Sequence, residues 1–258
     1  MAPVRSNPVR RNILISGASS GIGAQMAREF AARGRNLALC ARRTDRLEEL
    51  RDELASAHPE ITIAIRRIDV SEPDQVFDGV SALAAELGGL DRVIVNAGVG
   101  KGQPIGTGRF DANLATVRTN FIGALAQCEA AMAIFRANGT GHLVVVASLA
   151  AFRGLPRSVT AYAATKAGVA SLAEGLRAET VTTKALRGIK VTTLFPGYIQ
   201  SEMNPEPGAM LSKTVPAVRS MISAMEREAR TAMVPPWPWA IGGTLMKVLP
   251  LSIVARFL

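Results

Sequence analysis

The sequence predicts an α/β fold in which a doubly wound parallel sheet is covered by helices on both faces. Short runs rich in Val, Ile and Leu alternate with helical apolar spacing, and this alternation requires right-handed crossovers between parallel strands. The 258 residues are 48% hydrophobic and 20% charged, enough to bury one large core. We therefore expect a single domain, with residues 10–203 as its core and 204–258 as a helical C-terminal cap and apolar tail.

The spacing of the apolar residues predicts where each strand and each helix lies. Strands are predicted at residues 12–16, 36–40, 61–65, 92–95, 142–147 and 190–195. Helices are predicted at residues 21–33, 44–54, 71–87, 111–137 and 160–186. Thr44 is the expected cap of the second helix, and Ser71 with Asp74 resembles a capping box on the third. After Pro196 the chain is rich in proline and contains no clear strand.

Composition narrows the classes of protein. Thirty Lys and Arg against 21 Asp and Glu give a net charge of +9, which favours anionic partners: nucleotides, nucleic acid or an acidic membrane surface. The basic residues are dispersed and only 5% of residues are aromatic, which argues against nucleic-acid binding. The sequence contains no run of about 18 uncharged apolar residues, so we predict no transmembrane helix.

The cysteines and the N-terminus indicate a compartment. Cys40 and Cys128 are too few for a disulfide framework and lack zinc-ligand spacing, so we interpret both as buried packing residues and expect no metal. The N-terminus lacks the central apolar run of a secretory signal. A reducing, cytoplasmic environment is therefore expected.

A glycine-rich turn lies where the first predicted strand meets the first helix. Gly17 allows a tight turn, Gly21 lets a pyrophosphate approach the backbone, and Gly23 lets the helix pack closely on the strand. The free N–H groups of the helix suit phosphates. In this context the pattern predicts a dinucleotide site, with an ordinary tight turn as the alternative.

The end of the second strand indicates which dinucleotide fits. An acidic residue at this point binds the ribose hydroxyls of NAD, but here Arg42 and Arg43 follow the strand. Two guanidiniums suit a 2′-phosphate, so the sequence favours NADP(H). A solvated basic loop is the alternative.

A second cluster of polar residues suits proton transfer. The Tyr162 phenol and the Lys166 ammonium are four residues apart, hence on one face of a predicted helix. A cation favours the ionised phenol, so Tyr162 can exchange a proton with a carbonyl or alcohol. Ser148 follows a strand at the ligand-binding edge, where its hydroxyl can bond the reacting oxygen. A plain surface pair is the alternative for Tyr162 and Lys166.

Together these motifs resemble those of the short-chain dehydrogenase/reductase family. The matching motifs, in order and at family-like spacing, are residues 16–23, Asn96-Ala97-Gly98, Asn120, Ser148, residues 162–166 and Pro196-Gly197. The resemblance covers residues 10–203 and implies a Rossmann-type domain that binds NAD(P) and acts on CH–OH groups.

The resemblance also implies residue roles. Tyr162 would be the catalytic acid/base, Ser148 would orient the carbonyl, and Lys166 would lower the pKa of Tyr162 while binding the nicotinamide ribose. Asn120 would hold a water molecule in a proton relay. The implied cofactor-binding residues are Gly17, Ser19, Ser20, Gly21, Ile22, Gly23, Arg42, Arg43, Asp69, Val70, Asn96, Ala97, Gly98, Tyr162, Lys166, Pro196, Gly197, Ile199 and Ser201.

The C-terminal segment departs from the family pattern. Many tetrameric members end in a short strand with a Gly-Gly turn, whereas residues 237–258 resemble an apolar helix broken by proline. This favours a homodimer, built by resemblance from the helices that contain Asn120 and Tyr162, over a tetramer. An alanine face at Ala163, Ala167, Ala170 and Ala173 would allow the close packing.

The cap suggests either a hydrophobic substrate or plain core packing. The cap contains flexible methionines and two tryptophans, which suit an adaptable apolar pocket: Met203, Met210, Met221, Met225, Met233, Trp237 and Trp239. The tail with Lys247 and Arg256 would lie on an anionic membrane surface, on the body of the protein, or on a partner subunit.

The leading hypothesis is an NADP(H)-dependent carbonyl reductase or alcohol dehydrogenase acting on a hydrophobic small molecule. Reduction of a 3-oxoacyl thioester is the alternative within enzymes. A non-catalytic NADP-binding regulator is the alternative of another class, although such a protein would not need Asn120, Ser148, Tyr162 and Lys166 together.

Overall fold

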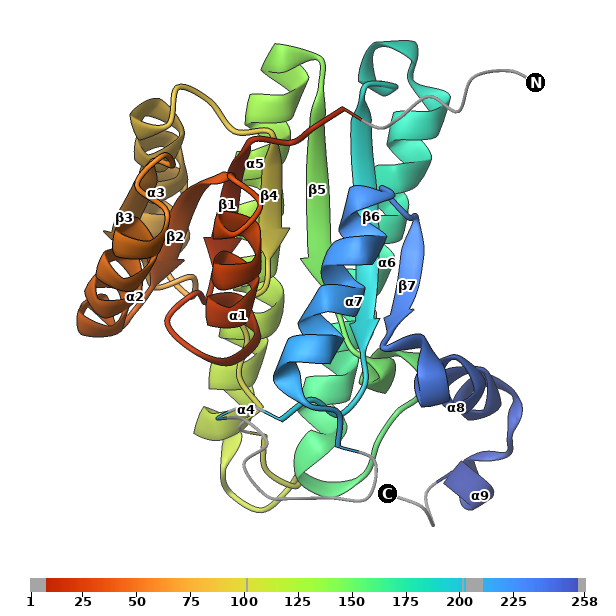
Figure 1. Cartoon of the computed structure of the whole chain (residues 1–258). Helices are drawn as coiled ribbons and strands as arrows, with labels where there is room; N and C mark the ends of the chain where they lie inside the picture. The colour runs from red at the N-terminus through yellow and green to blue at the C-terminus, as the bar shows by residue number, and fades with distance from the viewer. Residues whose placement is uncertain (1–7, 101, 201, 203–210, 255–258) are drawn as a thin grey trace.

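The centre of the molecule is a seven-stranded sheet with the order β3-β2-β1-β4-β5-β6-β7, in which all neighbouring strands are parallel. The computed structural model describes residues 8–100, 102–200, 202 and 211–254. The strands are β1 (Asn12–Ser16), β2 (Asn36–Ala41), β3 (Ile63–Arg67), β4 (Arg92–Val95), β5 (Gly141–Val146), β6 (Ile189–Pro196) and β7 (Thr231–Val234). The predicted parallel sheet is confirmed, and the carboxyl ends of its strands meet at one edge (Figure 1).

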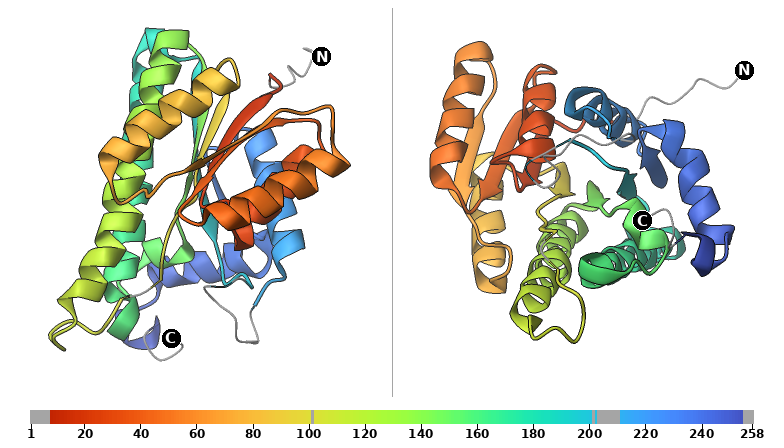
Figure 2. Two further views of the ribbon diagram at one scale, coloured as in Figure 1. Left: turned by 90° about the vertical axis from the view of Figure 1, so that its left-hand side faces the viewer. Right: turned by 90° about the horizontal axis from the view of Figure 1, so that it is seen from below.

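Helices cover both faces of the sheet (Figure 2). One face carries α1 (Gly21–Ala31), α2 (Thr44–Ala57) and α7 (Thr214–Glu226); the other carries α3 (Pro73–Glu86), α5 (Gly123–Asn138) and α6 (Thr160–Thr182). Alternate residues of β1 point to opposite faces, so Leu14 belongs to one core cluster and Ile13 and Ile15 to the other. The sheet thus separates the core into two layers of apolar packing.

The helix predicted at residues 111–137 is interrupted. It consists of α4 (Phe110–Val117), one π-helical turn η1 (Arg118–Ile122) and α5. Asn120 lies inside the π turn and is 1% exposed. Such turns are rare and often occur at functional sites, and nothing in the apolar spacing of the sequence signals this one.

Both predicted helix caps are wrong. Arg43 precedes α2 and Glu72 precedes α3, and neither helix has a side-chain cap. Ser71 instead donates from its backbone N and its Oγ to the Asp69 carboxylate, at 3.0 and 2.7 Å. The short polar residues here close a turn after β3 rather than start a helix.

Strand β7 corrects the expectation that no strand follows Pro196. It pairs with β6, where Leu194 is opposite Ala232. The strand has four residues and only Val234 is buried, so neither its length nor an alternating pattern marks it. Strand β3 also lies two residues later than predicted, because the strand ends in the exposed Arg66 and Arg67.

The predicted helical cap is confirmed as α8 (Pro236–Val248) and α9 (Leu251–Val254). Helix α8 packs on the 3-10 turn η2 (Leu149–Phe152), where a side chain at Gly243 would collide with Leu149 and Phe152. Arg153 donates to the Leu249 carbonyl at 2.6 Å. The inner face of the cap is therefore folded onto the body. Within the described part of the chain, no helix is long and apolar enough to span a bilayer.

The structure decides between the two alternatives for some of the cap methionines. Met221 and Met225 of α7 are fully buried in the core, as the core-packing alternative predicts. Of the alanine face of α6, Ala163 and Ala173 are buried within the chain's own core, whereas Ala170 is half-buried and Ala167 is exposed.

Candidate active site

A cleft of about 550 Å³ opens at the carboxyl edge of the sheet, beside the point where the strand order reverses between β1 and β4. Its walls contain the predicted cofactor-binding residues Gly17, Ser19, Ser20, Gly21, Ile22, Gly23, Arg42, Arg43, Asp69, Val70, Asn96, Ala97, Gly98, Tyr162, Lys166, Pro196, Gly197 and Ile199. Ser148 also lines the cleft. Ser201 lies outside the described residues.

The glycine turn has no room for side chains. A Cβ on Gly23 would lie 2.2 Å from the carbonyl oxygen of Gly17, which itself has a φ of +65°. The Ser16 hydroxyl donates to Ile94 and accepts from the backbone N–H groups of Asn96 and Ala97, at 3.0 and 3.1 Å. These bonds hold the turn after β1 against the turn after β4, so both present bare backbone to the cleft.

Arg43 lies over the glycine turn. Its Nη2 donates to the hydroxyls of Ser19 and Ser20, at 3.2 and 2.7 Å. Arg42 and the Asp69-Val70 pair line the same end of the cleft. Hydroxyls and guanidiniums that converge beside an open glycine turn are donors for phosphate oxygens, so this end fits the phosphate-bearing part of a dinucleotide.

The side chains of Ser148, Tyr162 and Lys166 meet at the opposite end of the cleft. Ser148 follows β5, and Tyr162 and Lys166 lie on the first turns of α6. Lys166 Nζ donates to the Val146 carbonyl at 3.0 Å and lies 5.8 Å from the centre of the Tyr162 ring. Burial lowers the pKa of Lys166 to about 8.

The pKa of Tyr162 shifts in the direction opposite to the one expected. Burial raises it above the ordinary value, while a hydrogen bond with Ser148 partly opposes this shift and the neighbouring Tyr198 adds to it. The expected lowering by Lys166 is not among the causes of the shift, and burial is the largest of them. Tyr162 therefore carries its proton at neutral pH.

Asn120 supports the cleft from behind. Its Oδ1 accepts from the Val99 N–H and its Nδ2 donates to the Val99 carbonyl, both at 2.8 Å. A Cβ on Gly98 would approach Asn120 Oδ1 to 3.3 Å and Lys166 Nζ to 3.5 Å. Asn120 thus fixes the segment that follows β4, which passes between the Asn120 side chain and the ammonium of Lys166.

The sequence did not indicate one residue of the wall, Glu202, or the contact that Trp239 makes with Gly197. Trp239 of α8 is 6% exposed and packs so closely on Gly197 that a Cβ there would lie 2.2 Å from the indole ring. Glu202, after β6, also lines the cleft. A tryptophan more than forty residues from Gly197 carries no local signal, and an exposed glutamate resembles any solvated residue.

Known proteins resemble this chain in sequence. The model of the family described as short chain dehydrogenase matches residues 11–211. An uncharacterized oxidoreductase of Mycobacterium tuberculosis (strain ATCC 25618 / H37Rv) is 50% identical over 250 residues, covering 96% of this chain and 97% of the relative.

Two solved structures share the fold. A short chain dehydrogenase/reductase from Burkholderia phymatum in complex with NAD has a TM-score of 0.81 at 20% identity, over 92% of each chain. An alcohol dehydrogenase from Thermococcus sibiricus complexed with 5-hydroxy-NADP has a TM-score of 0.76 at 23% identity, over 86% of this chain and 95% of that one.

The cleft and these similarities define a nucleotide-binding oxidoreductase with a Rossmann fold. The chain belongs to the short chain dehydrogenase family, as the sequence motifs predicted.

Proposed function

We propose that the protein is an NADP(H)-dependent oxidoreductase that interconverts a carbonyl and an alcohol on a hydrophobic small molecule. One observation carries the proposal: a single cleft holds Ser148, Tyr162 and Lys166 at one end and Arg42 and Arg43 at the other. The first group suits proton transfer to a carbonyl oxygen, and the second suits a 2′-phosphate.

A bound nicotinamide supplies the hydride for this reaction. In the reducing direction, the Tyr162 hydroxyl donates its proton to the substrate oxygen, and its raised pKa keeps that proton available. The Ser148 hydroxyl donates a hydrogen bond to the same oxygen. Lys166 binds the nicotinamide ribose and places its charge where the Tyr162 phenolate forms. Asn120 holds a water molecule through which Tyr162 is reprotonated.

The preference for NADP(H) rests on Arg43, whose guanidinium lies against Ser19 and Ser20. We expect Arg43→Ala to raise the Kd of NADPH at least tenfold and to change that of NADH by less than threefold, since the lost ion pair involves the 2′-phosphate. Fluorescence titration measures both. Equal losses for the two cofactors would refute the preference.

A hydrophobic substrate is supported by the apolar groups around Tyr162. Leu155, Ala150 and Met246 pack in one cluster with it, and the Tyr198 and Trp239 rings lie 6.1 Å apart nearby. A panel of ketones of increasing hydrophobicity, with one 3-oxoacyl thioester, tests the class. We expect kcat/KM to rise with apolar area; turnover of the thioester alone would contradict this.

We also propose a homodimer in a reducing cytoplasm. Ile122, beside Asn120, and Val181 of α6 are 38% and 58% exposed, so the helices containing Asn120 and Tyr162 offer apolar surface for a partner. Sedimentation of the wild type and Ile122→Glu tests the dimer: we expect a dimer that the glutamate dissociates.

The proposal of a reducing cytoplasm rests on the two cysteines, because Cys40 and Cys128 are free and buried.

The outer face of α8 suits peripheral contact with an anionic membrane. Ile241, Leu245 and Val248 are exposed at helical spacing, and Trp237, at the non-helical start of α8, is also exposed. No acidic residue follows Glu228 in the sequence. Flotation with phosphatidylglycerol vesicles should carry the full chain but leave Trp237→Ser/Ile241→Ser in solution. Equal behaviour of the two proteins would contradict this contact.

A further inference from the structure

A carboxylate of the protein itself lies at the cationic end of the cofactor cleft. Glu202 Oε2 is 3.0 Å from Nη2 of Arg43, and Glu202 Oε1 is 3.8 Å from Nη1 of Arg46. Arg43 follows β2 and Glu202 follows β6, so this ion pair joins segments from opposite sides of the cleft.

The groups around Glu202 form a site for an anion. We define this anion site as the hydroxyls of Ser19 and Ser20 with the guanidiniums of Arg43 and Arg46. Arg43 Nη2 donates to both hydroxyls as well as to Glu202. Hydrogen bonds from Arg43 and then Ser20 lower the pKa of Glu202, so its carboxylate is charged at neutral pH and accepts bonds that a phosphate would accept.

We propose that Glu202 is an internal competitor for the 2′-phosphate of NADP(H), and that its carboxylate must leave the anion site before this phosphate binds Arg43. The inference rests on the proposed function, since it takes Arg43 as the phosphate ligand. It adds a residue that tunes cofactor affinity and selectivity without touching the nicotinamide or the substrate.

The size of the effect follows from the exposure of the ion pair. The side chains of Arg43 and Glu202 are 43% and 53% exposed, and ion pairs this exposed are weak. A competitor of this strength raises the apparent Kd of its ligand by about two- to sixfold. NADH has a hydroxyl where NADPH has the phosphate, so its binding does not require Arg43 to be released.

The test compares Glu202→Gln with Glu60→Gln. The control removes the same charge from an exposed residue that precedes β3, at the opposite edge of the sheet from the cleft. We expect Glu202→Gln to lower the Kd of NADPH by about two- to sixfold at low salt, to leave that of NADH within twofold, and to lose most of this effect at 500 mM NaCl. Glu60→Gln should match the wild type.

Two nucleotide probes identify the phosphate that competes. Adenosine 2′,5′-bisphosphate carries the 2′-phosphate without a pyrophosphate, and ADP carries the pyrophosphate without the 2′-phosphate. We expect Glu202→Gln to tighten binding of the bisphosphate only. Tighter binding of ADP alone, or an unchanged Kd for both probes, would overturn the proposal.

An Arg43→Ala background separates this inference from the cofactor preference. Glu202→Gln should lose most of its effect there, because its closer partner is missing and only the longer contact with Arg46 remains. If Arg43→Ala weakens NADPH binding while Glu202→Gln changes nothing in the wild type, Glu202 is no competitor and the NADP(H) preference stands. If Arg43→Ala leaves NADPH binding unchanged, the preference itself fails.

Discussion

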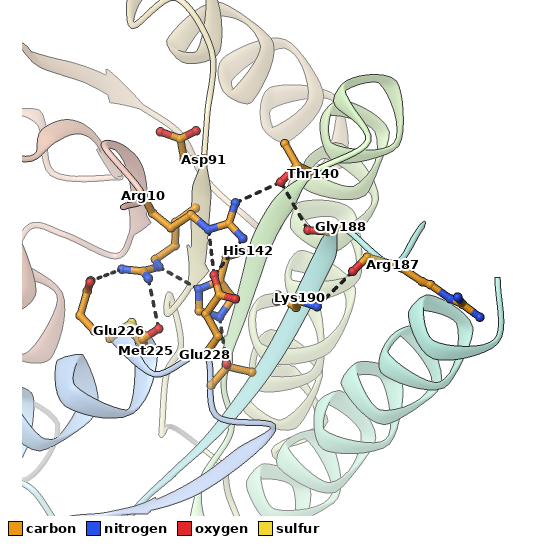
Figure 3. Close-up of polar contacts among 12 residues, drawn as sticks. Arg10, Asp91, Thr140, His142, Arg187, Gly188, Lys190, Met225, Glu226 and Glu228 are labelled. Carbon is orange, nitrogen blue, oxygen red and sulfur yellow. Dashed lines mark hydrogen bonds and ion pairs between the residues drawn. The ribbon is translucent and has the colours of Figure 1, made fainter. Parts of the chain in front are cut away.

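Arg92 Nε donates a hydrogen bond of 2.9 Å to Nδ1 of His142, inside the sheet at the edge opposite the cleft. The bond fixes the imidazole tautomer: Nδ1 accepts, so Nε2 carries the proton and donates to Thr192 Oγ1 at 2.8 Å. Figure 3 shows Arg10, Glu226 and Glu228 near His142. Arg10 pairs with Glu228 at 2.8 Å, and Arg92 with Glu226 at 2.6 Å.

This arrangement predicts acid sensitivity. Burial, followed by the charges of Arg92 and Arg10, holds the pKa of His142 well below 6.5. Below pH 6.5, His142 binds a proton in the unfolded chain but stays neutral in the folded chain. The folded state is therefore favoured above that pH, and its stability falls as the pH falls. One such group removes about 1.4 kcal/mol between pH 7.5 and 5.5.

Urea unfolding across this pH range measures the effect. His142→Gln should be less stable at pH 7.5, because the bonded imidazole is lost, but its stability should change less with pH. The second histidine of the chain, the partly exposed His58, provides the control: His58→Gln should keep the wild-type slope. An unchanged slope in His142→Gln would contradict this account.

Cofactor binding should weaken as the pH passes about 8. The buried Lys166 has a pKa lowered to about 8, so above that pH it loses the charge that attracts an anionic ligand. NADPH titrations from pH 6.5 to 9.5 should give a rising Kd in the wild type and a constant, higher Kd in Lys166→Met. A wild-type Kd that is flat across this range would show that Lys166 does not act through its charge.

Two glycine substitutions should have opposite effects. Gly23→Ala places a Cβ 2.2 Å from the Gly17 carbonyl oxygen, so it should lower stability by about 1–3 kcal/mol and abolish NADPH binding. Gly175, in α6, has open space at this position, and Gly175→Ala should raise stability by about 0.5–1 kcal/mol. Thermal unfolding and NADPH titration measure both. Equal effects would mean that steric crowding does not shape the glycine turn.

The contact between Trp239 and Gly197 should couple the cap to the cleft. Gly197→Ala would collide with the indole and should cost about 1–3 kcal/mol of stability, but less than half of that when Trp239 is already Ala. Gly242→Ala, whose Cβ would lie 3.7 Å from the same indole, is the control: it adds an alanine to helix α8 without a collision and should not lower stability. Additive losses in the double variant would argue against the coupling.

The sequence predicted the features that rest on local spacing. The glycine turn, the pair Tyr162 and Lys166, and the alternating strands all have fixed separations along the chain, and the structure contains each of them. Arg42 and Arg43 likewise lie in the predicted cleft.

Features that depend on contacts between distant residues were missed. Strand β7 forms because it pairs with β6, and its own four residues do not indicate a strand. Trp239 reaches Gly197 only through the fold of α8. The raised pKa of Tyr162 has the same origin, because its largest cause is burial by the surrounding elements.

The most direct test of the central claim is NADPH oxidation at 340 nm by wild type and Tyr162→Phe, with an apolar ketone as substrate. The substitution removes only the hydroxyl that donates the proton. We expect kcat to fall by about 10²–10⁴-fold, while the Kd of NADPH changes less than threefold. Wild-type turnover that persists in Tyr162→Phe would contradict the account, because the proton would then come from another group.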